Sequence, residues 1–304
     1  MKSARLPSWR EGETRESLLA FLDAVEDVAP ADRVVIFDND GTLWCEKPTY
    51  PQVHFFVSEL ERAVATRPDL AERSEYRALL DEDRAALAAM GIGRVALALV
   101  ELFEGISPEA FTGRVERFFA DEVHPARGVA YRDLLYIPML ELIDELRARH
   151  FSVFIGTAGG ADFVRAISMK LYGIPPERVV GSKVIYEVDR VDGRLGLIRT
   201  ARLDGDPNEG PAKLPGIQRQ IGRRPILAAG NSPGDAEMIE YTSTGDGPTL
   251  GLLVNHDDAE REYAYTSEAG TFDAAEPILD TAHRLGWTVA SMRDDWLTVF
   301  GDAT

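Results

Sequence analysis

Two acidic side chains lie two residues apart, directly after the apolar stretch VVIF at residues 34–37. Asp38 and Asp40 flank a single asparagine and precede Gly41-Thr42. Side chains at i and i+2 of an extended chain point to the same side, so these carboxylates are expected to be neighbours. Two like charges about 4 Å apart repel by roughly 4 kcal/mol at an effective dielectric of about 20. The pair therefore predicts a bound cation.

Polar residues also follow two later apolar stretches. The segment FSVFIGTAGG at 151–160 turns from apolar to polar at Thr157, and RPILAAG at 224–230 is followed by Asn231 and Asp235. Parallel sheets bind their ligands beyond the carboxyl ends of the strands. We therefore expect these residues to converge on the two acids that follow the first apolar stretch.

The side chains in this set indicate phosphoryl chemistry with a magnesium ion. Carboxylate and amide oxygens, without cysteines or paired histidines, favour Mg²⁺ over Zn²⁺. Thr157 offers a hydroxyl, Ala158 and Gly159 offer backbone N–H groups, and Asp162 begins a helix whose positive end favours anions. Lys213 adds a compact positive charge. One acid can attack phosphorus, and a second can protonate the leaving oxygen and then activate water.

The alternation of segments predicts the elements that position these residues. Apolar strands are expected at 33–38, 151–156, 224–230 and 250–255, with amphipathic helices between them. Strands separated by helices are typical of a parallel sheet covered on both faces. The fold class is therefore predicted to be α/β, with a Rossmann-like three-layer core.

The spacing of apolar residues in a second region differs from that in the core. Residues 46–135 have helical spacing throughout, and Ser107-Pro108 is a typical helix start. We interpret 46–135 as an inserted all-helical cap domain, and 1–45 with 136–304 as the α/β core. Residues 178–203 predict a short strand and a hairpin that turns at Asp192-Gly193.

Composition excludes several classes of function. The 304-residue chain is 45% hydrophobic and 28% charged, as in soluble globular proteins, and carries a net charge of −18. That charge argues against a broad nucleic-acid surface, and no stretch has the roughly 18 apolar residues of a membrane span. A single cysteine and an N-terminus without an apolar stretch indicate a cytoplasmic protein. Oligomeric state is left open.

Taken together, FDNDGTLW, IGTAGG, Lys213 and AAGNSPGDAEM resemble the four motifs of the haloacid dehalogenase-like hydrolases. The resemblance is to the phosphoserine-phosphatase-like branch, which has a helical (C1-type) cap. It implies a Mg²⁺-dependent phosphomonoesterase that acts on a small phosphorylated metabolite through an aspartyl-phosphate. The implied roles are nucleophile for Asp38, general acid/base and carbonyl metal ligand for Asp40, phosphoryl binding for Thr157 and Lys213, and metal binding for Asn231 and Asp235.

This sequence departs from the family pattern at several positions. Asn231 stands where an acid is usual, which predicts weaker Mg²⁺ binding. Lys47 stands where phosphoserine phosphatases have a glutamate, so the substrate is expected to differ from phosphoserine. Glu46, one residue earlier, is a candidate for substrate binding, and both it and Trp44 either face the substrate or pack. No role is assigned to 255–265.

Two alternatives to hydrolysis stay open from the sequence. Asn231 also fits a catalytically impaired phosphate-binding or regulatory protein on the same fold. A phosphotransferase would keep the chemistry but deliver the phosphoryl group to an acceptor other than water.

Overall fold

A computed structural model describes residues 5–191 and 193–301 of the chain. The strands are β1 Val34–Phe37, β2 Ser152–Gly160, β3 Val179–Ser182, β4 Val184–Val191, β5 Arg194–Leu203, β6 Leu227–Gly230, β7 Leu250–Asn255 and β8 Thr288–Ser291. The α-helices are α1 Glu13–Ala24, α2 Pro51–Thr66, α3 Ser74–Leu80, α4 Arg84–Met90, α5 Ile92–Glu101, α6 Pro108–Asp121, α7 Ile137–Ala148, α8 Ala161–Tyr172, α9 Lys213–Gln220, α10 Ala236–Ser243, α11 Ile278–Leu285 and α12 Met292–Asp295.

The core is a six-stranded parallel sheet in the order β3-β2-β1-β6-β7-β8. In the centre of the sheet, Ile36 of β1 lies beside Phe154 of β2 and Ala228 of β6. β1 therefore has β2 on one side and β6 on the other. The segments that follow these three strands consequently leave the sheet at the same edge, as predicted from the sequence.

Alternate residues of β1 face opposite layers of helices. Val35 and Phe37 pack into a hydrophobic cluster with residues of α1, α7 and α8, whereas Ile36 packs with residues of α9, α10 and α11. Both faces of the sheet are thus covered by helices. Because side chains on both sides of β1 are buried, all four of its residues are apolar. This arrangement confirms the predicted three-layer α/β fold.

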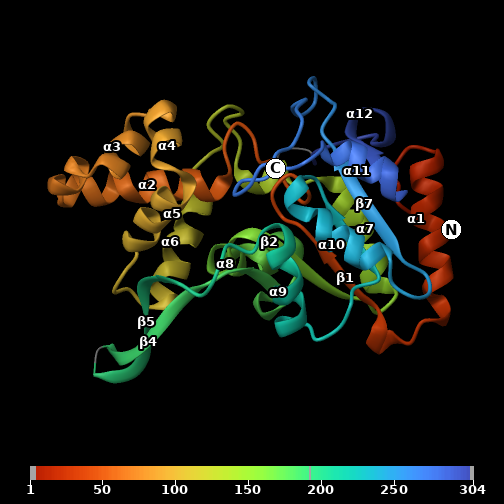
Figure 1. Cartoon of the computed structure of the whole chain (residues 1–304), viewed down its shortest axis with the longest axis horizontal. Helices are drawn as coiled ribbons and strands as arrows, with labels where there is room; N and C mark the ends of the chain where they lie inside the picture. The colour runs from red at the N-terminus through yellow and green to blue at the C-terminus, as the bar shows by residue number, and fades with distance from the viewer. Residues whose placement is uncertain (1–4, 192, 302–304) are drawn as a thin grey trace.

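Helices α2 to α6 lie between β1 and β2 in sequence and form one end of the molecule, with the sheet at the other (Figure 1). Ser107 caps α6 as predicted, since its Oγ accepts a hydrogen bond from Ala110 N at 3.2 Å. The helices are joined by a cluster of aromatic side chains centred on Phe55 and Phe118. The expected limits of the cap domain at 46 and 135 stay a prediction.

The hairpin β4–β5 forms a separate two-stranded antiparallel sheet and packs against the helical end of the molecule. Arg199 of β5 exchanges backbone hydrogen bonds with the α5–α6 connection: Gly105 N donates to Arg199 O, and Arg199 N donates to Ile106 O, both at 2.9 Å. Its guanidinium lies 4.0 Å from the ring centre of Phe111 and hydrogen-bonds Asp162 of α8. The sequence predicted this hairpin but not its contact with the inserted helices. Asp192, in the predicted turn, lies outside the described residues.

The strands differ from their predicted limits in one respect that matters for the site. β2 was expected to end at 156, but it continues through Gly160, which pairs with Ser182 of β3 after an irregularity in register. The TAGG segment is therefore the distorted end of a strand and not a free loop. Its hydrogen bonds to β3 fix the backbone that leads into α8.

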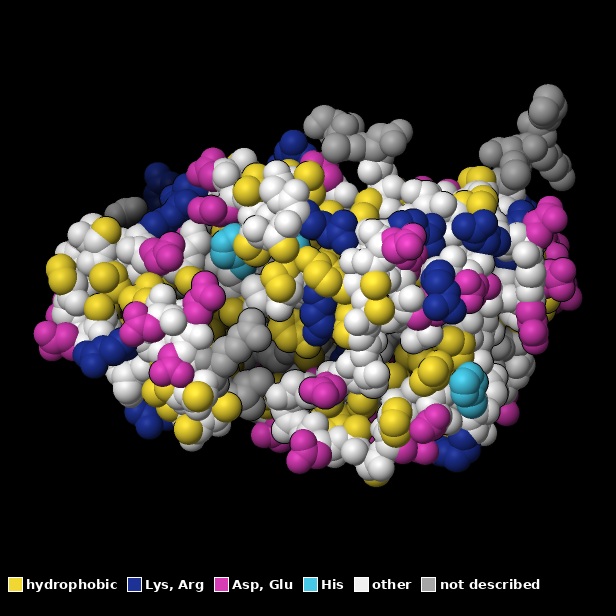
Figure 2. Space-filling model, turned by 90° about the horizontal axis from the view of Figure 1, so that it is seen from above, with side chains coloured by type: hydrophobic (Ala, Val, Ile, Leu, Met, Phe, Trp, Pro, Cys, Tyr) yellow, Lys and Arg dark blue, Asp and Glu magenta, His cyan; other side chains and the backbone are white. Residues whose placement is uncertain are grey.

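The surface has a mixed charge. On the face drawn in Figure 2, acidic and basic side chains of the described residues are interspersed, without one dominant basic area. Among the residues that the structure describes, no helix combines the length and apolar character needed to cross a bilayer.

Candidate active site

The predicted site residues of four separate segments meet at the carboxyl edge of the sheet. Lys213 Nζ donates to Asp38 Oδ1 at 2.7 Å, to Asp235 Oδ1 at 2.5 Å and to the carbonyl oxygen of Gly156 at 2.6 Å. The first turn of α9 positions this lysine, and its side chain is almost completely buried. One ammonium group therefore joins β2 to the segments that follow β1 and β6.

The loop after β6 holds Asp235 through its own backbone. Asp235 Oδ2 accepts hydrogen bonds from Asn231 N at 3.1 Å and Ser232 N at 3.0 Å, and from Ser232 Oγ at 3.2 Å. The bond from Ser232 N is part of a capping box at the start of the helical turn 233–235. Asp235 Oδ1 is thereby aimed at Lys213.

Asp40 lies in a drier environment than an ordinary surface acid. Its Oδ1 accepts a hydrogen bond from Trp44 Nε1 at 2.9 Å, and its Oδ2 accepts one from Asn39 Nδ2 at 3.3 Å. Burial raises the pKa of Asp40 to about 6, even though the bond from Trp44 favours the ionised form. A carboxyl group with this pKa can both donate and accept a proton near neutral pH. Trp44 is buried, so it packs and also orients this acid.

Negative charge is in excess at this edge of the sheet. Burial, followed by the charge of Asp235, raises the pKa of Asp38 well above its ordinary value, while Lys213 acts against the rise. Burial also opposes the ammonium of Lys213, but Asp235 and Asp38 outweigh it and raise its pKa. One lysine thus pairs with two acids, Asp38 and Asp235, and the atoms that these acids can offer to a cation are all oxygens. Such a set fits a hard divalent cation of the Mg²⁺ type.

The distorted end of β2 supplies the threonine and glycines predicted for anion binding. Thr157 Oγ1 accepts a hydrogen bond from Gly159 N at 2.9 Å, and Asn208 Nδ2 donates to Thr157 O at 2.9 Å. The N–H of Gly160 donates to Gln52 Oε1 of α2 at 2.9 Å. The sequence had not indicated Asn208 or Gln52, because both contacts depend on residues distant along the chain.

Asn231 lies against the turn that directly follows Asp40. Its Oδ1 accepts a hydrogen bond from Thr42 Oγ1 at 3.4 Å, and its Nδ2 is 3.4 Å from Ser267 Oγ. Gly41 has a φ of +71°, and a Cβ there would collide with the Asn231 side chain. Only glycine fits at this turn. The amide is therefore fixed against the backbone that directly follows Asp40.

The segment after β7 contacts the turn at Gly41. His256 Nε2 is 2.8 Å from the carbonyl oxygen of Gly41, and its Nδ1 is 3.3 Å from Glu262 Oε2. Because a carbonyl only accepts, Nε2 carries a proton. Tyr265 stacks on the imidazole, with ring centres 4.4 Å apart. This explains the segment 255–265, to which sequence analysis gave no role; the contact spans 215 residues, and no local pattern signals it.

Glu46 is buried beside this turn and not at an open surface. A Cβ placed on Gly41 would lie 3.0 Å from Glu46 Cδ, and Glu46 Oε1 is 3.5 Å from Lys47 Nζ. Lys47 in turn lies 4.3 Å from the ring centre of Tyr265. The substrate-binding role predicted for Glu46 stays a prediction.

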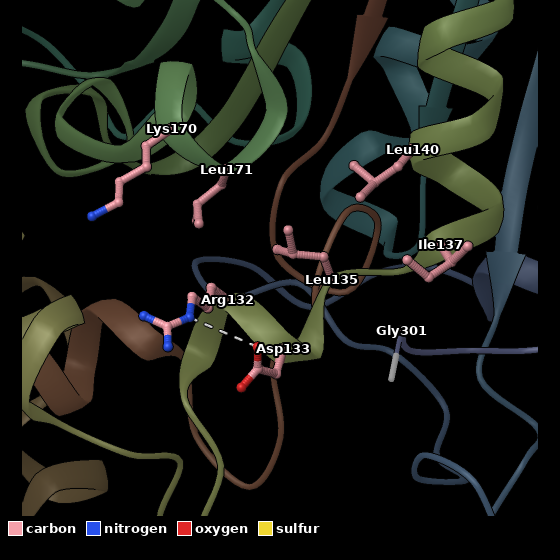
Figure 3. A pocket seen from close by; sticks show the side chains of 8 residues that line it. All are labelled: Arg132, Asp133, Leu135, Ile137, Leu140, Lys170, Leu171 and Gly301. Atoms are coloured by element: carbon pink, nitrogen blue, oxygen red, sulfur yellow. Dashed lines mark ion pairs between the residues drawn. The ribbon is translucent and has the colours of Figure 1, made fainter. Parts of the chain in front are cut away.

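A cavity of about 340 Å³ lies elsewhere, where the end of α8 faces the start of α7 (Figure 3). Its lining is partly apolar, with Arg132 and Asp133 paired at 3.8 Å on one side and Lys170 on the other. None of the predicted site residues lines it. The site at the strand ends is therefore separate from this cavity.

Several solved structures are similar to this chain to different degrees. A protein of unknown function from Bordetella pertussis Tohama I has a similar structure, with a TM-score of 0.53 and 18% identity over 84% of this chain and 97% of that chain. A phosphoserine phosphohydrolase-like protein from Francisella tularensis subsp. tularensis SCHU S4 has a TM-score of 0.40 and 19% identity, covering 74% and 88% of the two chains. Cytosolic 5'-nucleotidase IIIB bound to cytidine has a TM-score of 0.44 and 14% identity, covering 90% and 92%.

No curated protein matches the sequence. A model of the family described as haloacid dehalogenase-like hydrolase matches residues 35–240. The match includes the strand ends that carry Asp38, Thr157 and Asn231, together with Lys213. The chain therefore belongs to the haloacid dehalogenase-like hydrolases.

Proposed function

We propose that the protein is a Mg²⁺-dependent phosphomonoesterase that acts through an aspartyl-phosphate on a small phosphorylated metabolite. The observation that carries the proposal is the contact of Lys213 Nζ with both Asp38 and Asp235, at 2.7 and 2.5 Å. A buried ammonium between two carboxylates, beside a threonine and paired glycines, suits a phosphoryl group. Phosphoryl transfer depends mainly on positioning and charge neutralisation.

In the first step, an Asp38 oxygen attacks phosphorus and the ester oxygen leaves. Lys213 engages Oδ1, so we assign the attack to Oδ2. Asp40, with a pKa of about 6, gives its proton to the leaving oxygen. In the second step, the Asp40 carboxylate takes a proton from water, which attacks phosphorus and releases phosphate from Asp38. Both acids return to their starting state.

Four residues would hold Mg²⁺: Asp38, Asn231 and Asp235 by their side chains, and Asp40 by its main-chain carbonyl. When bound, the ion neutralises charge on the phosphoryl oxygens. Thr157 would donate to the phosphoryl group, and Lys213 would neutralise its charge. Helix α2 covers the glycines through Gln52, and this cover favours a small substrate.

The test is hydrolysis of p-nitrophenyl phosphate with Mg²⁺, with EDTA, and by an Asp38→Asn variant. We expect EDTA to abolish turnover and Asp38→Asn to reduce it by at least about 10³-fold, as for other essential nucleophiles. Asp144→Asn is the matched control, because the Asp144 side chain is 77% exposed. Mass spectrometry of acid-quenched protein should detect a phosphoryl adduct on the wild type alone.

Undiminished turnover in the Asp38→Asn protein would rule out this mechanism. Phosphate binding without turnover over a panel of esters would instead indicate a binding protein, the alternative to which Asn231 points. Phosphorylated products formed from added alcohols would indicate transfer to an acceptor other than water.

A further inference from the structure

The first turn of α2 places a side chain of the inserted helices directly on the anion-binding segment of the core. Gln52, the second residue of α2, accepts a hydrogen bond from Gly160 N through Oε1 at 2.9 Å. The two residues are 108 positions apart in sequence. This amide is therefore part of the surroundings of the candidate site, although it comes from the inserted region.

The two glycines are fitted to this amide. A Cβ added to Gly159 would lie 2.7 Å from Gln52 Oε1, and one added to Gly160 would lie 2.7 Å from Gln52 Nε2. Real Cβ atoms do not approach other atoms this closely, so side chains at these positions would displace Gln52. The glycine pair allows the amide to lie flat against the end of β2.

The amide has one end engaged and one end available. Gly159 N donates to Thr157 Oγ1, and Gly160 N donates to Gln52 Oε1. No residue in the described part of the chain accepts a hydrogen bond from Gln52 Nε2 within the site. The acceptor end of the amide is thus anchored to the backbone, and the donor end has no protein partner among the described residues.

We propose that Gln52 is a substrate-binding residue whose Nε2 donates to a phosphoryl oxygen while Oε1 stays anchored to Gly160. The inference rests on the proposed phosphatase function, because it assigns the substrate's phosphoryl group as the acceptor. A neutral amide is required for this task, since it accepts from an N–H at one end and donates to an oxyanion at the other. A carboxylate would keep the first bond and repel the phosphoryl group.

Gln52→Glu separates these two roles because it preserves shape and the acceptor but removes the donor. We expect the KM for p-nitrophenyl phosphate to rise by about 10- to 100-fold, as for loss of a hydrogen bond to a charged group. The Kd of inorganic phosphate, measured by calorimetry, should rise by a similar factor, and kcat should change less. Gln52→Ala should raise both constants by about tenfold. Gln218→Glu, on the exposed face of α9, is the matched control for added charge.

Amide hydrogen exchange of α2 shows whether Gln52 binds the phosphoryl group or only holds α2 against the end of β2. Faster exchange of α2 in Gln52→Ala, with KM and phosphate affinity unchanged in both variants, would overturn the proposal. The proposal is also overturned if the wild type hydrolyses esters and both Gln52 variants keep its KM and its Kd for phosphate. In that case the proposed phosphatase function still stands. If the wild type hydrolyses no ester but Gln52→Glu still weakens phosphate binding, the proposed function fails and Gln52 keeps its assignment as an anion ligand.

Discussion

The site at the strand ends and the interior of the inserted helices are both buried, but different interactions hold them together. At the site, Asp38, Asp235 and Lys213 are held by hydrogen bonds of 2.5 to 2.7 Å. In the insertion, the ring centre of Phe55 lies 5.5 Å from that of Phe103 and 5.6 Å from that of Phe118. The site is built from paired charges, whereas the insertion has a large aromatic cluster and a buried acid, Glu59, that pairs with Arg114 and Arg117 near its surface.

This difference predicts how each region responds to displacement. A buried charge that loses its partner is left without solvent or compensation, so the geometry of the site is tightly constrained. Apolar contacts have no strict direction, so aromatic rings can shift and still exclude water. Phe55 also contacts Phe163 of the core helix α8, with ring centres 5.4 Å apart. We therefore expect the residues of the site to keep their positions while the inserted helices α2 to α6 shift slightly relative to the sheet.

The largest expected effect is from breaking the charge pairing at the site. Lys213→Met leaves Asp38 and Asp235 buried without their cation, which should lower the free energy of unfolding by about 3 to 5 kcal/mol. Urea denaturation in EDTA would measure this loss. Lys170→Met, at an exposed position on α8, is the control. An equally small change in both variants would show that the site does not depend on pairing.

A smaller effect is expected where the insertion is tied to the core. Arg199 is 5% exposed and joins the hairpin to Asp162 and Phe111. Arg199→Met should cost about 1.5 to 3 kcal/mol through loss of a hydrogen bond to a charged group, and should speed amide exchange in β4 and β5.

Arg202, two residues along β5, is the matched control. Its side chain is 60% exposed, and its partner Glu187 is 65% exposed. Exposed pairs contribute little to stability, so Arg202→Met should leave both measurements close to wild type. Equal losses in the two arginine variants would contradict a special role for the buried one.

The smallest effect concerns acid sensitivity of the insertion. Burial lowers the pKa of His54 and of His124 below their ordinary value. The unfolded chain then binds more protons than the folded chain once the pH falls below about 6.5, so stability is lost from there down to the lowered folded values. Urea denaturation between about pH 7.5 and 5.5 would measure the loss.

His54→Gln should reduce the acid loss, since Gln does not titrate and can still bond the hydroxyl of Tyr131, which is 2.5 Å from His54 Nδ1. His283→Gln, at an exposed position of α11, should leave the loss unchanged. If both variants lose the same free energy of unfolding on acidification, this explanation is wrong.

Local sequence was sufficient to predict the strand-end residues. Asp38, Thr157 and Asn231 each follow an apolar stretch, and parallel pairing necessarily brings such ends to one edge of a sheet. The extension of β2 to Gly160 was missed, because pairing with β3 continues through residues whose types favour a turn. The structure brings the predicted residues together; their catalytic roles remain proposals.

The supporting contacts were beyond the reach of sequence patterns. Gln52 on Gly160, His256 on Gly41 and Arg199 on Asp162 each join segments that are distant along the chain. Each of these side chains is of a type that is common on protein surfaces. Nothing adjacent to them in sequence marks the partner.

By itself, the sequence determined which strands are followed by acidic and polar residues and that a helical region follows the first strand, because these features depend on residue type and short spacing. Only the tertiary structure decided that Lys213 bridges two acids, that a histidine supports the Gly41 turn, and that Gln52 covers the glycines. Those contacts arise from the order of strands in the sheet and from packing of the insertion on the core. They depend on distances in space that local spacing does not encode.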